Sequence, residues 1–314
     1  MVYEREQQKQ VFRVVDYIED HLEESLSLEK LAQISTYSPF HFQRMFKGMI
    51  GETPANYVKR LRLEKAAHLL IYDRQTSVTQ IAFMCGFTSL SYFTYSFQAY
   101  FKTSPKSWRE GAYLERFPRE YEDSKKSKQV RKKLEDSNEQ NPYTEFRWLD
   151  LDKIEIRELP RSTTVKNQRV GPYTSGVPLA WEEIYRWCES RELLEPNSTF
   201  LGVPRNNPYI TPPEKSRYEC HVVIREGDEV LYKDVETYSF IGGKHVVYEF
   251  EEPVDYSERS MLIECYSELY SIWLPRSGYK YLDNPVEMIQ IDSKANTLSL
   301  QCNIRAISLA IEPK

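Results

Sequence analysis

An internal repeat of about 50 residues in the N-terminal half constrains the fold more than any other feature. Residues 28–57 align with residues 78–108 at matching apolar, serine and proline positions. Ala32 falls on Ala82, Ser38 on Ser89, Phe42 on Phe93, Phe46 on Phe97 and Pro54 on Pro105. Each copy predicts a short helix, a tight turn and a second helix. We therefore expect an all-α domain with two helix-turn-helix units.

Helix start and stop signals support this division. In Ser38-Pro39, Thr53-Pro54 and Ser104-Pro105, an N-cap residue precedes a proline at the first helical position. Ser77 and Gln80 form a capping box, and Gly86 stands where a turn needs a left-handed residue. Between the copies, residues 54–71 predict a continuous helix of roughly 26 Å.

The second helix of the first copy carries side chains suited to reading DNA. Its apolar positions, Phe42, Met45, Phe46 and Met49, follow helical spacing and are expected to face the core. Ser38 is expected to cap the helix, whose opposite face presents Phe40, His41, Gln43, Arg44 and Lys47. In a major groove, Gln pairs with adenine and Arg with guanine, while Lys contacts phosphate.

The matching helix of the second copy has a different outward face. Leu90, Phe93, Phe97 and Phe101 are expected to face inward. After Ser89, the outward positions are Ser91, Tyr92, Thr94, Tyr95 and Gln98. Because this face lacks cations, we expect it to act through shape and hydroxyl contacts. For one copy alone a solvated helical hairpin is an equal alternative, but two copies with matching caps favour DNA reading.

Charge and composition divide the chain. The net charge is −5, yet residues 1–113 carry 14 Lys/Arg against 12 Asp/Glu. Residues 121–142 hold only two aliphatic side chains among dense charges, which is typical of a linker. The five cysteines form no CxxC pair, so a disulfide scaffold or a cysteine-based zinc site is not expected. We predict no metal and no cofactor. A charged N-terminus and the lack of a long apolar run predict a cytoplasmic protein with no membrane partner.

The C-terminal half alternates strand and helix patterns. Strands are expected at 154–159, 162–170, 200–203 and 217–224, with a helix at 177–190. The order recurs with a strand at 239–250, a helix at 255–273 and strands at 286–291 and 298–306. The fold class is therefore two domains: an all-α double helix-turn-helix, then an α+β domain with a pseudo-duplicated β-α-β-β unit.

Glu287 is the most unusual residue of this half. It alternates with Ile289 and Ile291, so it lies on an apolar strand face. A core-facing carboxylate needs compensation, and aromatic neighbours would make it suitable for an organic cation. The alternative is a strand-edge glutamate that reaches water.

Residues 8–113 resemble the DNA-binding domain of the AraC/XylS transcription regulators. The resemblance is carried by LEKLAQISTYSPFHFQRMFKGMIGETPANYVKRLRLEKAAHLL and VTQIAFMCGFTSLSYFTYSFQAYFKTSPKSWRE. It implies promoter binding to double-stranded DNA, with RNA polymerase as a further partner. By position, the base-reading candidates are Phe40, Gln43, Arg44, Ser91, Tyr92 and Tyr95. In place of the family's frequent glycines, this chain has Ser35-Thr36 in its first turn and Lys102 after its second reading helix.

Residues 144–314, beyond a linker at 114–143, resemble GyrI-like effector-binding domains. The matching stretches include VGPYTSGVPLAWEEIYRWCE, LGVPRNNPYITPPEKSRYECHVVI and WLPRSGYKYLDNPVEMIQI. The resemblance implies a pseudo-twofold sheet around a small-molecule cavity lined by aromatics. Glu287 matches an acidic residue of that cavity, and the expected lining residues are Tyr173, Trp181, Tyr185 and Tyr218. For each aromatic, ordinary core packing remains open.

The two halves together predict a DNA-binding transcription regulator, not an enzyme, whose C-terminal domain senses an aromatic or cationic small molecule. Two alternatives remain open. In the first, the C-terminal domain hydrolyses its ligand, with Glu287 and a nearby tyrosine transferring a proton. In the second, it contacts another protein and binds no ligand.

Overall fold

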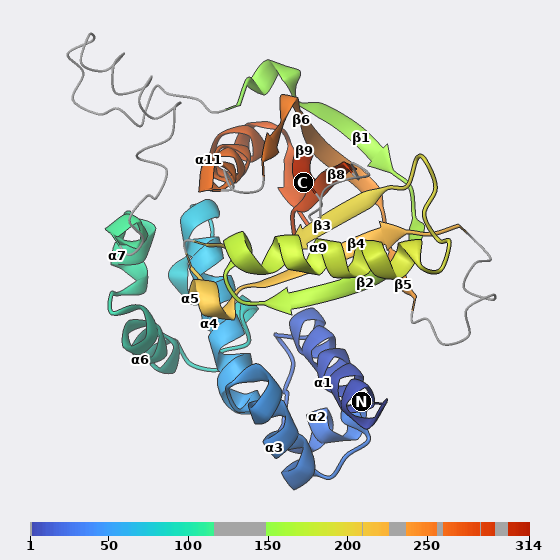
Figure 1. The fold of residues 1–314 in the computed structure, drawn as a ribbon. Coiled ribbons are helices and arrows are strands. Elements are labelled where there is room, and N and C mark those ends of the chain that lie inside the picture. The colour runs from blue at the N-terminus through green and yellow to red at the C-terminus, as the bar shows by residue number, and fades with distance from the viewer. Residues whose placement is uncertain are drawn as a thin grey trace. The chain divides into compact units, whose positions relative to one another are not determined.

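The structure, a computed structural model, describes residues 2–115, 149–208, 210–225, 237–255, 260–282, 284–292 and 301–314. The chain forms two compact units, Met1–Phe117 and Pro118–Lys314, which are described separately. Figure 1 shows helices in the first unit and a sheet with helices in the second. The linker expected at residues 114–143 lies outside the described residues, apart from its first two.

The first unit consists of helices that match the predicted repeat. Its first helix-turn-helix contains α2 (Leu28–Ser35) and α3 (Pro39–Ile50), and its second contains α5 (Val78–Met84) and α6 (Leu90–Phe101). Helix α4 (Pro54–Tyr72) connects them, α1 (Val2–Asp20) precedes them, and α7 (Pro105–Arg109) with the 3-10 turn Ala112–Glu115 follows. The double helix-turn-helix prediction is confirmed.

The predicted caps form as expected. The hydroxyls of Ser38, Thr53 and Ser104 each accept a hydrogen bond from a backbone N–H of the helix that follows. Ser77 and Gln80 form a reciprocal capping box, and Gly86 adopts a φ of +77° in the turn between α5 and α6. Each such cap satisfies a backbone donor that the helix itself cannot pair.

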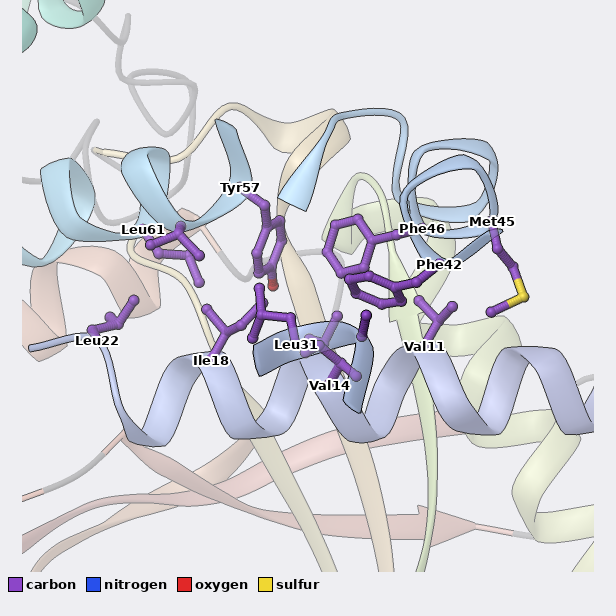
Figure 2. Close-up of a cluster of buried hydrophobic side chains, with 13 residues drawn as sticks. Val11, Val14, Ile18, Leu22, Leu31, Phe42, Met45, Phe46, Tyr57 and Leu61 are labelled. Carbon is purple, nitrogen blue, oxygen red and sulfur yellow. The ribbon is translucent and has the colours of Figure 1, made fainter. Parts of the chain in front are cut away.

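Apolar side chains from four helices form one core of this unit. Figure 2 shows Val11, Val14 and Ile18 of α1 facing Phe42 and Phe46 of α3, with Leu31, Tyr57 and Leu61 completing the cluster. Each fully buried phenylalanine contributes about 1.5–3 kcal/mol of burial free energy. The core therefore holds the inner face of α3 and leaves its other face toward solvent.

Two of the expected inward positions are wrong. Met49, in the last turn of α3, is 40% exposed although its helical spacing matches that of Phe42, and Ile50 packs against the core there instead. Leu90 is 39% exposed, since it is the first residue of α6 and precedes the turn that packs.

The second unit is built on one antiparallel sheet. Its strands are β1 (Glu155–Leu159), β2 (Ser162–Val170), β3 (Phe200–Pro204), β4 (Arg217–Val223), β5 (Tyr238–Phe240), β6 (Gly243–Asp255), β7 (Tyr279–Tyr281), β8 (Val286–Asp292) and β9 (Gln301–Pro313). Among the described residues the order is β1-β6-β9-β8-β3-β4-β2-β5, and β7 pairs with β9. The helical segments are α9 (Tyr173–Glu189), α11 (Ser260–Glu268), the π-helical η6 (Leu269–Trp273) and α12 (Leu274–Arg276), with 3-10 turns at Leu151–Lys153 and Pro213–Lys215.

The strand order confirms the predicted duplication. In β2-α9-β3-β4, the third strand pairs with both the first and the second. In β6-α11-β8-β9 the same pairing recurs. The two β-α-β-β copies meet where β3 pairs antiparallel with β8, at the centre of the sheet.

The expected strand at 239–250 is wrong in one respect, because the structure divides it into β5 and β6. Gly242 stands between them with a φ of +68°, and a Cβ there would lie 2.4 Å from the carbonyl oxygen of Leu159. The glycine therefore permits a sharp change of direction that the apolar alternation did not indicate. Helix α9 begins four residues before the predicted start, directly after Pro172, and β7 was not predicted.

Candidate nucleic-acid interface and ligand site

Helix α3 places its polar side chains on the face opposite its core. Ser38 caps the helix, its hydroxyl accepting from the His41 backbone N–H at 3.4 Å. Gln43, Arg44 and Lys47 are exposed, and Phe40 is 78% exposed. An exposed face that combines an amide, a guanidinium and an ammonium group can pair with base edges and phosphates.

His41 differs from the other predicted contacts of α3. Its ring is half-buried and lies 5.0 Å from the ring of Tyr37, in the turn before α3. Part of the His41 ring is therefore covered by Tyr37 of the turn, so His41 is less exposed than the other predicted contacts.

Helix α6 presents hydroxyls and aromatic rings instead of cations. Ser89 caps it, accepting from the Tyr92 backbone N–H at 3.3 Å. Ser91 and Gln98 are exposed, Tyr92 is 51% exposed and Tyr95 is 72% exposed. Exposed aromatic side chains of this size are suited to contact with a partner surface.

A cation from another helix lies beside α6. The Lys59 ammonium of α4 is 5.2 Å from the centroid of the Tyr92 ring. Sequence reasoning missed Lys59, because nothing in the repeat pattern indicates which α4 positions face α6.

Glu287 is the centre of the candidate ligand site. Its side chain is completely buried on β8, so the alternative of a water-exposed strand-edge glutamate is wrong. The Tyr218 hydroxyl donates to Glu287 Oε2 at 2.6 Å, and the Tyr266 hydroxyl donates to Oε1 at 3.4 Å. The shorter bond has the length of a charge-assisted hydrogen bond.

Strand register brings these groups together. Gly202 of β3 is paired with both Glu287 of β8 and Cys220 of β4. A Cβ at Gly202 would lie 1.8 Å from the Tyr218 hydroxyl oxygen, so the Tyr218 ring passes directly over the glycine. The missing side chain therefore creates the space through which Tyr218 reaches the carboxylate.

Tyr173 supports Tyr218 from the start of α9. Their rings meet edge to face with centroids 5.7 Å apart. The Tyr173 hydroxyl donates to the Arg217 carbonyl oxygen at 2.8 Å. Tyr173, Tyr218 and Glu287 are thus linked by direct contacts.

Trp181 and Tyr185 form a neighbouring aromatic group. Both rings lie 6.1 Å from the ring of Phe200, which is two residues before Gly202 on β3. Trp181 is fully buried and Tyr185 is half-buried. Both aromatics contact Phe200, whereas Tyr266 contacts Glu287. Sequence reasoning missed Tyr266, because its helical position does not distinguish it from ordinary core residues.

Alternate residues of β4 place a charged cluster on the other face of the sheet. The Glu219 carboxylate lies 3.3 Å from an Arg217 nitrogen, 3.6 Å from Lys166 Nζ and 3.2 Å from His221 Nε2. Burial alone raises the pKa of Glu219, but Arg217, His221, Arg205 and Lys166 together hold it well below its usual value. His221, whose Nδ1 is 3.0 Å from Thr164 Oγ1, has a structural setting.

Within the described ranges, no group of three or more His, Cys, Asp or Glu side chains is arranged to hold a metal ion. No helix in the same ranges is long and apolar enough to cross a membrane.

Two family models match the chain. A helix-turn-helix domain model matches residues 31–111, and a model described as the GyrI-like small molecule binding domain matches residues 152–305.

Curated relatives match the N-terminal part. An uncharacterized HTH-type transcriptional regulator, YbfP of Bacillus subtilis, is 32% identical over 124 residues, 40% of this chain and 41% of that protein. The HTH-type transcriptional activator RhaS of Escherichia fergusonii is 40% identical over 98 residues, 31% of this chain and 35% of that protein. The match therefore spans less than half the length of either relative.

A solved structure covers the same region. The DNA-binding domain of AdpA, a global transcriptional factor in complex with a target DNA, is 28% identical, with a TM-score of 0.32. That likeness covers 34% of this chain and 95% of the solved chain. The family models and the curated relatives together identify the chain as an AraC-type helix-turn-helix domain joined to a GyrI-like small-molecule binding domain.

Proposed function

We propose that this protein is a transcription regulator that binds promoter DNA through α3 and α6 and senses a small molecule through Glu287. We expect an aromatic or cationic compound, and the preferred ligand is an organic cation. The burial of Glu287 beneath two tyrosine hydroxyls carries the sensing half of this proposal. The domain boundaries that go with it are 8–113, 114–143 and 144–314.

The exposed chemistry of the two helices supports DNA binding. Gln43 and Arg44 on α3 are suited to adenine and guanine edges, and Lys47 is suited to phosphate. On α6, Ser91, Tyr92, Tyr95 and Gln98 offer hydroxyl, amide and apolar contacts. We expect base readout to come mainly from α3, while α6 contributes shape and backbone contacts.

The surroundings of Glu287 support a cationic ligand. A buried carboxylate loses its hydration, and a cation that enters beside it restores charge balance. The tyrosine rings of Tyr173, Tyr218 and Tyr266 offer π-faces that favour a positive charge. A neutral aromatic compound would use only the rings and would bind more weakly.

The test is a calorimetric titration of the full chain with lipophilic cations and with neutral aromatics of matched size. We expect saturable cation binding that Glu287→Gln abolishes. Glu252→Gln is the matched control, because it removes an exposed carboxylate from β6 of the same domain and should leave binding unchanged. Equal binding by wild type and Glu287→Gln would reject the cation assignment.

Two further measurements define the mode of action. DNA affinity is remeasured with saturating ligand, where coupling of about 1–3 kcal/mol is the usual range. The ligand is then recovered and analysed for cleavage. Unchanged ligand agrees with a sensor, whereas turnover lost in Glu287→Gln would favour the hydrolase alternative.

The proposal also includes RNA polymerase as a partner and the cytoplasm as the location of the protein. The chain's similarity to HTH-type transcriptional regulators supports polymerase as a partner. All five cysteines are free and buried, which suits a reducing compartment.

A further inference from the structure

We propose that a polar network of Glu52, Arg60, Glu64 and Tyr100, centred on the buried Arg60–Glu64 pair and here called the interlock, sets the geometry between the reading helices α3 and α6. These four are positioning residues that act through α3 and α6. The inference rests on the proposed DNA binding, because it names the residues that allow both helices to engage one duplex.

The interlock runs from the end of α3 to the end of α6. Glu52 lies in the turn between α3 and α4, and its Oε1 accepts from Arg60 Nε at 2.7 Å. Arg60 Nη1 donates to both Glu64 oxygens at 3.1 Å, one helical turn further along α4. The Tyr100 hydroxyl, in the last turn of α6, donates to Glu64 Oε1 at 3.1 Å.

Arg60 also contacts the core that holds α3. Its guanidinium carbon is 4.9 Å from the centroid of the Tyr57 ring, and that ring meets Phe46 of α3 edge to face at 5.4 Å. Helix α4 packs against both α3 and α6. One side chain near the middle of α4 thus connects polar contacts toward α6 with aromatic contacts toward α3.

Stability alone does not account for this arrangement. The Arg60 and Glu64 side chains are 5% and 7% exposed, so both ions have lost most of their hydration. Buried ion pairs are often no more stable than apolar residues of similar volume. Their hydrogen bonds have directions, however, whereas apolar contacts tolerate sliding and rotation. The interlock therefore selects one orientation of α6 relative to α3.

That orientation matters because DNA positions its half-sites by helical repeat. Adjacent major-groove segments are about 34 Å apart, and one inserted base pair rotates the second segment by about 35°. A protein whose two reading helices are fixed relative to each other must lose one set of contacts when the half-site spacing changes. If the two helices can reorient, the protein can keep both sets of contacts.

The experiment uses the full chain and a duplex that the wild-type protein selects from a random pool. The duplex is then made with one or two base pairs inserted between the half-sites, and as the α3 half-site alone. The test variant replaces three of the four network residues by apolar ones: Arg60→Met, Glu64→Leu and Tyr100→Phe together. Ile18→Val, in the core shared by α1 and α3, is the control for a general loss of stability.

For the wild type we expect the insertions to weaken binding about tenfold or more, as happens when one half-site is lost. The triple variant should bind the single half-site like wild type, bind the selected duplex more weakly, and lose less than about threefold on insertion. Ile18→Val should keep the wild-type spacing penalty. If the triple variant does not fold, Tyr100→Phe alone, which keeps the ring, should show the same change to a smaller degree.

A triple variant with the wild-type spacing penalty would overturn the inference, as would a wild type with no penalty. If the wild type selects no sequence at all, the proposed DNA binding fails, and the inference fails with it.

Discussion

At the scale of single residues, Arg44 and Lys47 share the exposed face of α3 but have different expected partners in DNA. Replacing Arg44 by Ala should cost about 1–3 kcal/mol of specific binding and relax preference at one base pair. Lys47→Ala should weaken all sequences alike and reduce the salt slope by about one. Anisotropy titrations at several salt concentrations separate the two effects. Identical behaviour of both variants would contradict the assignment of Arg44 to a base.

Thr36 is a second residue whose local setting makes a prediction. It caps α2 with a φ of 62°, a left-handed conformation that is strained for a β-branched side chain. Thr36→Gly should therefore raise the free energy of unfolding by about 0.5–1 kcal/mol, despite the greater freedom of glycine in the unfolded chain.

Gly51→Ala is the matched control. Gly51 caps α3 with a φ of +83°, and a Cβ there would meet nothing within 4 Å, so the substitution changes only the backbone strain. It should lower the free energy of unfolding by about 1 kcal/mol. Urea unfolding measures both variants, and a shift in the same direction for both would exclude backbone strain as the cause.

At the scale of elements, the crossing of Tyr218 over Gly202 joins β3, β4 and β8 in one site. Gly202→Ala would place a methyl group 1.8 Å from the Tyr218 hydroxyl oxygen, so the ring must move away from Glu287. We expect a loss of about 1–3 kcal/mol in the free energy of unfolding, typical of overpacking. Cation binding should fall as well.

Gly176→Ala provides the comparison, since it lies in α9 where a Cβ would meet nothing closer than 4.0 Å. Alanine there should be neutral or stabilising by up to about 1 kcal/mol. Urea unfolding and the near-ultraviolet circular dichroism of the tyrosines measure both changes. A Gly202→Ala protein with wild-type stability and an unchanged tyrosine signal would show that the Tyr218 ring does not pass over Gly202.

At the scale of the whole molecule, the cysteines report on the integrity of both units. All five are buried and free, and burial raises the pKa values of Cys85, Cys188 and Cys302 to about 12. Because the thiolate is the reactive form, they should be nearly inert toward a thiol reagent such as DTNB in the native protein.

After unfolding in guanidinium, we expect all five thiols to react, and the reaction is followed by absorbance. At denaturant concentrations below the global unfolding transition, the rate of thiol reaction should rise only if one of the two units opens locally. Rapid reaction of any thiol in the native protein would contradict its burial.

Much of the architecture follows from short-range signals in the sequence. The caps at Ser38, Ser77 and Ser104 depend on residues within one helical turn, so the helix starts could be predicted from the chain alone. Strand alternation placed Glu287 on the core-facing side of β8, and the duplicated pattern predicted the paired β-α-β-β units.

The tertiary structure decided which of these residues meet. Tyr266 of α11 meets Glu287 of β8, 21 residues further along the chain, and Glu64 meets Tyr100, 36 residues further along, through the packing of α4 against α6. The division of 239–250 into β5 and β6 depends on the approach of Gly242 to Leu159 and Pro160. Periodicity determines which face a side chain occupies. Its partner on that face depends on strand order, register and helix crossing, which arise only when distant segments pack.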